Sequence, residues 1–353
     1  FFIYLILITL TNNLPNLNIT SPIILAEGRH FLYLEHIYKS IFFLRFLLLF
    51  LVVNKLLEKN DLNIKFFFLS CAFFGLLVAV DIIIQVTFGR NLIGLPLSKY
   101  LSFPRPSSFF GHENVAGGYL QKFSFFFIFY ALHHFSKKKK EIKKYFYILI
   151  LFSFFLIPLI LTLNRMPILI YLVSIFLFLL IERKFKLILI SFFLFSTIMF
   201  LALKYSSAER INYEFQNFYK SSIQLLTITP KLVMGAKLDE ISQDHNISGR
   251  GYLLLFNSGL QVWKKNKIFG SGLKSFRLNC SYENGQTCST HPHNYVLEIL
   301  IDTGIIGFVL IYSIFIFAVL NFFKFYNQNF NSSIKYIALP FFLIIFFEFF
   351  PIR

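Results

Sequence analysis

Residues 65–88 read KFFFLSCAFFGLLVAVDIIIQVTF, an almost entirely apolar stretch. A hydrocarbon core about 30 Å thick is crossed by roughly 20 apolar residues in helical form, so this stretch predicts a membrane-spanning helix. Other apolar windows lie on both sides of it and bring the expected number of spans to nine. With ends uncertain by a few residues, the spans are 1–11, 37–54, 65–88, 115–134, 145–163, 167–181, 187–203, 294–323 and 334–350.

The composition agrees with a membrane location. Only 14% of the 353 residues are charged, whereas soluble domains average about 25%. The formal net charge of +17 does not indicate a nucleic-acid partner, because the basic residues cluster between apolar windows, where membrane proteins carry their orientation signals. We therefore expect an all-α, polytopic transmembrane helical bundle.

Charge in the short loops predicts the orientation. Residues 135–144 hold six lysines and one glutamate, and short loops rich in Lys and Arg stay in the cytoplasm. Alternation from this loop places 55–64, 182–186 and 324–333, which also carry basic residues, on the same side. The segments 12–36, 89–114, 164–166 and 204–293 then lie outside.

The long outer segment divides the chain into three parts. About seven spans occupy residues 1–203, residues 204–293 are expected to form a partly helical periplasmic loop or cap, and about two spans occupy 294–353. The window 294–323 is long enough to include an amphipathic approach to the membrane. Both ends of the chain lie in or beside apolar runs, so we expect further spans beyond one or both ends.

Two outer segments contain arginines of interest. Residues 103–114 include Arg105 and Glu113 in a loop shaped by proline and glycine. For Arg105 a functional role and simple interfacial anchoring are equally supported, whereas for Arg90 anchoring is favoured. Arg165 lies in a turn between two spans, where no carboxylate partner is near in sequence, and this favours function over anchoring.

A third arginine lies in the cap. Arg250 follows Ser248-Gly249 and opens an amphipathic stretch. Its planar guanidinium matches phosphate oxygens, although its spacing alone favours an ordinary surface arginine. Gly270-Ser271-Gly272 lacks the lysine that ends a phosphate-binding loop and is expected to form a turn.

The segment 291–307, HPHNYVLEILIDTGIIG, carries the most chemical information. His293 would lie at the amino end of a helix, where the helix dipole disfavours imidazolium, so a neutral ring could accept a proton near pH 7. An interfacial histidine that only caps the helix is an equally weighted alternative. Glu298 and Asp302 are one turn apart on an apolar helix, which predicts burial against a cation or water.

Metal and cysteine patterns are sparse. His291 and His293 are not accompanied by a Cys/His array or an Asp-rich loop, so no metal site is expected, and no Gly-x-Ser-x-Gly elbow occurs. Cys71 lies in an apolar span. Cys280 and Cys288 lie in the long polar segment and are placed to form a disulfide if that segment faces an oxidising compartment.

The order of these pieces resembles the O-antigen ligase and O-antigen polymerase superfamily of bacterial membrane glycosyltransferases. The resemblance extends over roughly residues 80–353, and its most specific piece is His293–Glu298 followed by Gly304–Gly307. The chain shows fewer spans than such proteins usually have. The other matching pieces are Gly89–Gly94 with Arg105, Phe110–Asn114, Asn164-Arg165, Ser248–Arg250, Ile268–Gly272 and Phe350–Arg353.

The resemblance implies transfer of a glycan from undecaprenyl diphosphate to an acceptor sugar hydroxyl of lipid A core, at the periplasmic face of the bacterial inner membrane. It implies inversion at the sugar and no metal, nucleotide or other cofactor. Arg165 and Arg250, with Arg105, would bind the diphosphate, and His293 would act at the acceptor. Glu113 and Glu298 are candidates for orienting the acceptor.

Other functions stay open at this stage. A repeat-unit polymerase of the same superfamily would share these motifs and would use a growing polysaccharide as its acceptor. A transporter or flippase would place ionisable residues and broken helices near mid-membrane, whereas the candidates here gather on one predicted face. A scaffold in an envelope complex would tolerate the loss of His293.

Overall fold

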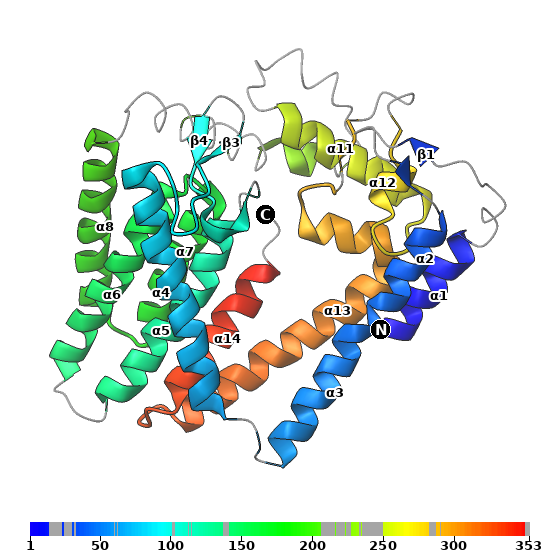
Figure 1. Ribbon diagram of the computed structural model, residues 1–353. Coiled ribbons are helices and arrows are strands. Elements are labelled where there is room, and N and C mark those ends of the chain that lie inside the picture. Colours follow the sequence, from blue (N-terminus) through cyan, green and yellow to red (C-terminus); the bar gives the residue numbers. More distant parts are fainter. Residues whose placement is uncertain are drawn as a thin grey trace. The chain divides into compact units, whose positions relative to one another are not determined.

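Figure 1 shows the computed structural model, which describes most of the chain. The chain consists of two compact units. Unit 1 comprises Phe1–Leu62, Gln216–Leu320 and Phe349–Arg353, and unit 2 comprises Asn63–Phe215 and Asn321–Glu348. The described residues are 1–13, 23–24, 30–31, 33–59, 61, 63–100, 103–111, 113, 115–136, 141–205, 216, 223, 227–232, 234, 250–281, 287–289 and 291–349.

Each span expected from the sequence coincides with helix in the described residues, and the prediction of a helical membrane protein is confirmed. The second expected span is a pair of helices, α2 and α3, that meet at Phe43. The helices are α1 (Phe2–Asn13), α2 (Tyr33–Phe42), α3 (Leu44–Glu58), α4 (Ile64–Phe88), α5 (Ala116–Ser136), α6 (Glu141–Leu161), α7 (Arg165–Ile181), α8 (Phe185–Tyr205), α11 (Arg250–Lys265), α12 (Phe276–Asn279), α13 (Tyr295–Gln328) and α14 (Lys335–Glu348).

Two short hairpins accompany the helices and were not expected. Strand β1 (Ile23–Ile24) pairs with β2 (His30–Phe31), and β3 (Ser98–Tyr100) pairs with β4 (Phe103–Arg105), both antiparallel. Strands this short show no alternation that a sequence pattern could reveal. The second hairpin matters for the site because β4 ends at Arg105.

The outer surfaces of the helices suit lipid. Side chains such as Phe66, Phe73 and Phe88 on α4 are 60–76% exposed, which is acceptable against hydrocarbon because lipid tails are as apolar as these rings. Among the described residues, three helices are long and apolar enough to cross a membrane: Ile37–Glu58, Ile64–Phe88 and Tyr295–Gln328. Shorter apolar helices are Phe2–Asn13, Tyr145–Leu161, Arg165–Ile181 and Phe185–Ile198.

Helix α5 lies at the centre of unit 2, where it packs against α4, α6, α7 and α14. Two of its rings are fully buried: Phe125 stacks on Tyr171 of α7 at a centroid distance of 5.6 Å, and Phe129 meets Phe178 edge-on at 5.1 Å. Gly75 of α4 permits close approach, because a Cβ there would lie 3.3 Å from the backbone of Phe123. Phenylalanine thus fills the core of this unit.

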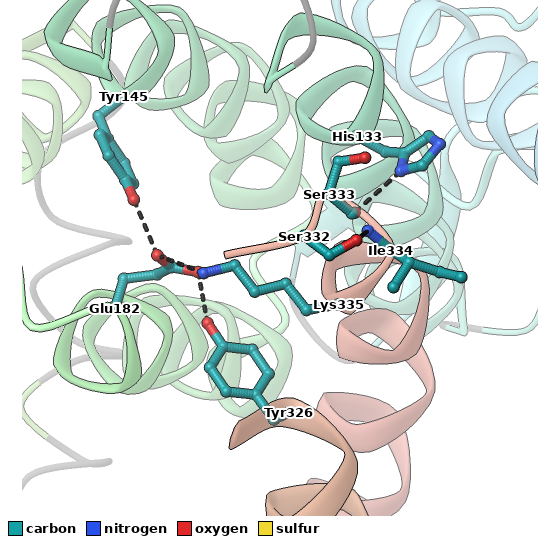
Figure 2. A network of polar contacts seen from close by, with 8 residues as sticks. All are labelled: His133, Tyr145, Glu182, Tyr326, Ser332, Ser333, Ile334 and Lys335. Atoms are coloured by element: carbon teal, nitrogen blue, oxygen red, sulfur yellow. Dashed lines mark hydrogen bonds and ion pairs between the residues drawn. The ribbon is translucent and has the colours of Figure 1, made fainter. Parts of the chain in front are cut away.

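One end of unit 2 contains a buried ion pair (Figure 2). Glu182, just after α7, lies 3.0 Å from the Lys335 ammonium at the start of α14, and each residue is 4% exposed. Glu182 also accepts hydrogen bonds from the hydroxyls of Tyr145, at 2.8 Å, and Tyr326. The Lys335 ammonium lies 4.2 Å from the ring centroid of Phe330. Burial of both charges is tolerable because each is paired and hydrogen-bonded.

This network changes the interpretation of Lys335. The basic residues of the loop 324–333, with Lys335 at the adjoining span end, were expected to act as orientation signals, whereas Lys335 links α14 to a partner 153 residues away. At the same end, the His133 Nδ1 donates to the carbonyl of Ser333 at 2.9 Å (Figure 2). Lys137–Lys140, on which the orientation chiefly depends, lie outside the described residues.

In unit 1, helix α13 is broken at Gly304, whose backbone adopts φ 63° and ψ −170°. The segment before α12 fits into the break: the amides of Ile305 and Ile306 donate to the carbonyls of Lys267 and Ile268. Only glycine fits at this position, because its φ is positive and a Cβ would collide with the backbone of Ile268. The break is therefore stabilised by backbone pairing.

Asp302 anchors the same segment, in a way that its pattern did not predict. Its carboxylate accepts the amide protons of Lys274, at 2.7 Å, and Ser275, at 3.1 Å, and the Ser275 hydroxyl at 3.3 Å. The residue is 6% exposed. The expectation of a cation or water beside Asp302 is thus replaced by backbone amides, which satisfy a buried carboxylate equally well.

Helices α1 and α11 complete the packing of unit 1. From α1, the Tyr4 hydroxyl donates to the carbonyl of Thr303 at 2.9 Å, and the Thr9 hydroxyl accepts from the amide of Leu273 at 3.0 Å. The amphipathic helix α11 buries its apolar face against the first turns of α13. The core consists of Ile228, Leu232, Leu253, Leu255, Phe256, Leu260, Val262, Phe276, Leu297 and Ile301.

Candidate functional site

His293 lies two residues before α13 in unit 1, with a half-buried side chain and a left-handed backbone at φ 53°. Its ring centroid lies 4.1 Å from that of His291, and its amide donates to the His291 Nδ1 at 3.3 Å. Burial, and next the neighbouring His291, lower the pKa of His293 to about 4. The ring is therefore neutral near pH 7, although the cause differs from the helix dipole invoked from the sequence.

Close packing fixes the backbone beside His293. A Cβ at Gly259 of α11 would lie 3.2 Å from the Pro292 side chain and would collide with Leu297, so α11 touches the chain on both sides of the histidine. The Asn294 side chain accepts the amide proton of Leu297 at 2.9 Å and caps α13. The side chain that caps α13 is therefore that of Asn294, next to His293.

Of the two acids that follow His293, Glu298 is accessible. Glu298 lies in the first turn of α13 and is half-buried, whereas Asp302, one turn further on, is committed to the amides of Lys274 and Ser275. The two acids therefore differ in role although they share one helix face: Asp302 binds backbone amides, and Glu298 is left partly exposed. Of the two, Glu298 is the candidate for contact with an acceptor.

Cys280 and Cys288 form a disulfide, with their Cα atoms 5.7 Å apart. The bridged segment is attached to α11, because the Thr287 amide donates to the Ser258 hydroxyl at 2.9 Å. Cys71 is buried in α4 and is the free cysteine. The disulfide thus ties the chain just after α12 to the segment that precedes His293, and the Thr287 hydrogen bond attaches that segment to α11.

Replacing Cys280 and Cys288 with serine is expected to destabilise unit 1 by about 2–3 kcal/mol, because the unfolded chain regains the freedom that a short closed loop removes. Thermal melting in detergent, compared with the wild-type protein under reducing conditions, measures the effect. Cys71→Ala is the control for loss of a thiol outside the bridge. Identical melting of the reduced, bridged and double-serine proteins would contradict the prediction.

Three candidates lie in unit 2. Arg105 ends β4, Glu113 is exposed just before α5, and Arg165 is the half-buried first residue of α7. At Gly117, in the first turn of α5, a Cβ would come within 2.8 Å of Asn164, so the turn before Arg165 packs on the helix that follows Glu113.

The loop of Arg105 reaches the same end of unit 2. The 3-10 helix η2 (Ser108–Phe110) packs against α4 and α5, and the rings of Phe110 and Tyr119 lie 5.2 Å apart. Figure 1 shows the β3–β4 hairpin at the ends of these helices. The structure therefore brings Arg105, Glu113 and Arg165 to one end of unit 2, and the Glu182 network lies at the other end of α7.

Arg250 begins α11 in unit 1, but its side chain and Ser248-Gly249 lie outside the described residues. Its backbone is nine residues, or about 14 Å of helix, from Gly259, which touches Pro292. His293, Glu298 and Arg250 thus belong to unit 1. His112, Asn114 and the Phe350–Arg353 motif also lie outside the described residues.

A set of buried polar residues around the Arg105 loop was missed. Asp81 and Gln85 of α4 are fully buried, and Asn91 is 5% exposed. All three bind the backbone or side chain of Ser108. The sequence does contain an indication of this set. An acid and an amide one turn apart in an otherwise apolar span destabilise it unless they bind a partner.

No candidate metal centre is found within the described part of the chain, where no three His, Cys, Asp or Glu side chains could hold an ion. The described residues provide a neutral imidazole and an acid in the first turn of the following helix in unit 1, and two arginines with an acid in unit 2. A neutral imidazole can accept a proton, and guanidinium groups can hold an anionic leaving group.

Comparison with known proteins identifies one family. Residues 148–312 match the family model described as O-antigen ligase. The matched range includes Arg165, Arg250, His293 and Glu298, and it begins after Arg105 and Glu113. No curated protein and no solved structure matches the chain significantly.

Proposed function

Because residues 148–312 match the O-antigen ligase family model, we propose that this chain is a membrane glycosyltransferase that transfers a glycan from undecaprenyl diphosphate to a sugar hydroxyl of lipid A core. The family covers both ligases and polymerases that act on lipid-linked glycans. The reaction would occur at the outer face of the bacterial inner membrane, with residues 204–293 in the periplasm. The observation that carries the proposal is the neutral, half-buried His293 inside the family domain.

In the proposed reaction, the acceptor hydroxyl oxygen attacks the anomeric carbon as His293 removes its proton. The bond between the anomeric carbon and the diphosphate oxygen breaks, and undecaprenyl diphosphate leaves with the electron pair. A single displacement of this kind inverts the anomeric configuration. The negative charge that grows on the diphosphate must be held, and Arg165, Arg250 and Arg105 would supply that stabilisation without a metal.

The pKa of His293 would depend on whether the anionic donor is bound. In the free protein its pKa of about 4 makes the ring a weak base. An anionic diphosphate bound nearby would favour the imidazolium and raise this pKa. Proton removal would therefore become more favourable once the donor is in place, and Glu298 or Glu113 would orient the acceptor.

The test is an assay with purified protein, a lipid-linked glycan and either lipid A core or a second repeat unit as acceptor. We expect a glycosylated lipid A core and free undecaprenyl diphosphate, whereas transfer to the repeat unit would identify a polymerase. Arg165→Ala should lower the rate at least tenfold, and Arg90→Ala, in the same outer region, should not. Absence of transfer to either acceptor by folded protein would refute the proposal.

A further inference from the structure

The buried polar residues of α4 have no role in the proposed reaction, yet burying them costs free energy of folding. Asp81 and Gln85 lie one turn apart in a helix of high apolar content, and both are fully buried. An acid and an amide removed from water destabilise the fold unless each finds hydrogen-bond partners. Their partners therefore reveal what these residues stabilise.

Ser108 is one common partner. Its hydroxyl donates to the Asp81 carboxylate at 2.6 Å, and its amide donates to the Gln85 Oε1 at 2.8 Å. Its carbonyl accepts from the Asn91 Nδ2 at 2.9 Å. All three polar groups of this serine are thus held by buried side chains. Its backbone is left-handed, at φ 53°, and a non-glycine residue keeps such a conformation only where its surroundings impose it.

The segment before β3 is the second partner. The Leu92 amide donates to the other Asp81 oxygen at 2.8 Å, and the Gln85 amide group donates to the carbonyl of Pro96 at 3.0 Å. Asn91 accepts from the amide of Leu95 at 2.7 Å. Asp81 and Gln85 therefore hold the chain on both sides of the β3–β4 hairpin.

Arg105 ends this hairpin, three residues before Ser108. We propose that Asp81 and Gln85 are positioning residues for glycan transfer, because they fasten both flanks of the hairpin to α4 and thereby set the location of Arg105 for the donor diphosphate. This inference rests on the proposed function. Displacement of a substrate-positioning group by about 1 Å can cost a factor of 100 in rate.

The experiment is a double-mutant cycle between Asp81 and Arg105, read as kcat/KM for the lipid-linked donor. Asp81→Leu, which removes both acceptors and keeps the branched shape of the side chain, is expected to lower kcat/KM about 10- to 100-fold. Asp81→Asn, which keeps one acceptor oxygen, should retain more activity. In an Arg105→Ala background, Asp81→Leu should cause little additional loss, because the positioned group is already absent.

Controls separate positioning from general loss of structure. Glu182→Gln at the opposite end of unit 2 should give the same fractional change with and without Arg105. Ser108→Ala, which removes one hydroxyl, repeats the cycle if Asp81→Leu does not fold. Equal losses from Asp81→Leu in both backgrounds, or full activity of Arg105→Ala, would overturn this inference while wild-type transfer still supports the proposed function. No transfer by the wild-type protein would overturn both.

Discussion

Replacement of His293 with alanine is expected to lower kcat for glycan transfer by about 100- to 10,000-fold, the usual contribution of a general base. The protein should still insert and fold, because α13 is capped by Asn294 and its first turns are held by the apolar core around Leu297. Initial rates of the purified variant at saturating donor and acceptor measure the effect. His134→Ala, an exposed histidine of α5, is the control.

The pH dependence tests the same role with a definite sign. Only the neutral ring accepts a proton, so activity is lost as the pH falls through the pKa of His293. Because this pKa is about 4 in the free protein, kcat/KM should stay level between pH 8 and pH 5 and fall below that range. His291→Ala removes one cause of the lowering and should move the fall to higher pH.

Two results would argue against His293 as the base. One is a wild-type rate in the His293→Ala protein. The other is an acidic limb of kcat/KM centred near 6.5, the ordinary pKa of a solvated histidine. The apparent pKa that governs kcat should exceed the one that governs kcat/KM, since the bound anionic donor favours the imidazolium.

Lys335→Met is expected to lower the free energy of unfolding of unit 2 by about 3–5 kcal/mol. The substitution removes the ammonium that lies 3.0 Å from Glu182 and leaves a carboxylate that is 4% exposed without its cation. The tyrosine hydroxyls of Tyr145 and Tyr326 still donate to Glu182, but they do not neutralise it. Thermal and denaturant unfolding in detergent measure the loss.

A double variant provides the internal control. Glu182→Gln combined with Lys335→Met leaves no buried charge and should recover most of the stability, so the two single effects should not add. Lys55→Met breaks the exposed pair with Glu58 and should not change the melting temperature measurably. Additive losses in the double variant would show that Glu182 and Lys335 are not coupled.

Much of the fold follows from local patterns. Each expected span coincides with helix because crossing a hydrocarbon core requires a fixed length of apolar chain, and windows such as 65–88 contain that length. The break before Ile305 could not be placed, since it depends on pairing with Lys267 and Ile268. The division at residues 203 and 293 stays a prediction.

Some residues of the candidate site could likewise be predicted from the sequence, and others could not. Arg165 and His293 were recognised from their positions at span ends and from the order of motifs, and both lie in the matched family domain. Asp81 and Gln85 were not recognised, because their partners at residues 92–96 and 108 lie in an irregular loop whose path no periodicity predicts.

The sequence alone determined the helical membrane architecture and the chemical class of the candidate residues, because apolar run length, charge and motif order are local properties of the chain. Tertiary packing decided the rest: that Lys335 pairs with Glu182, that Asp302 binds amides, and that burial keeps His293 neutral. These outcomes depend on which groups lose contact with water and which distant partners replace it, and packing alone creates that environment.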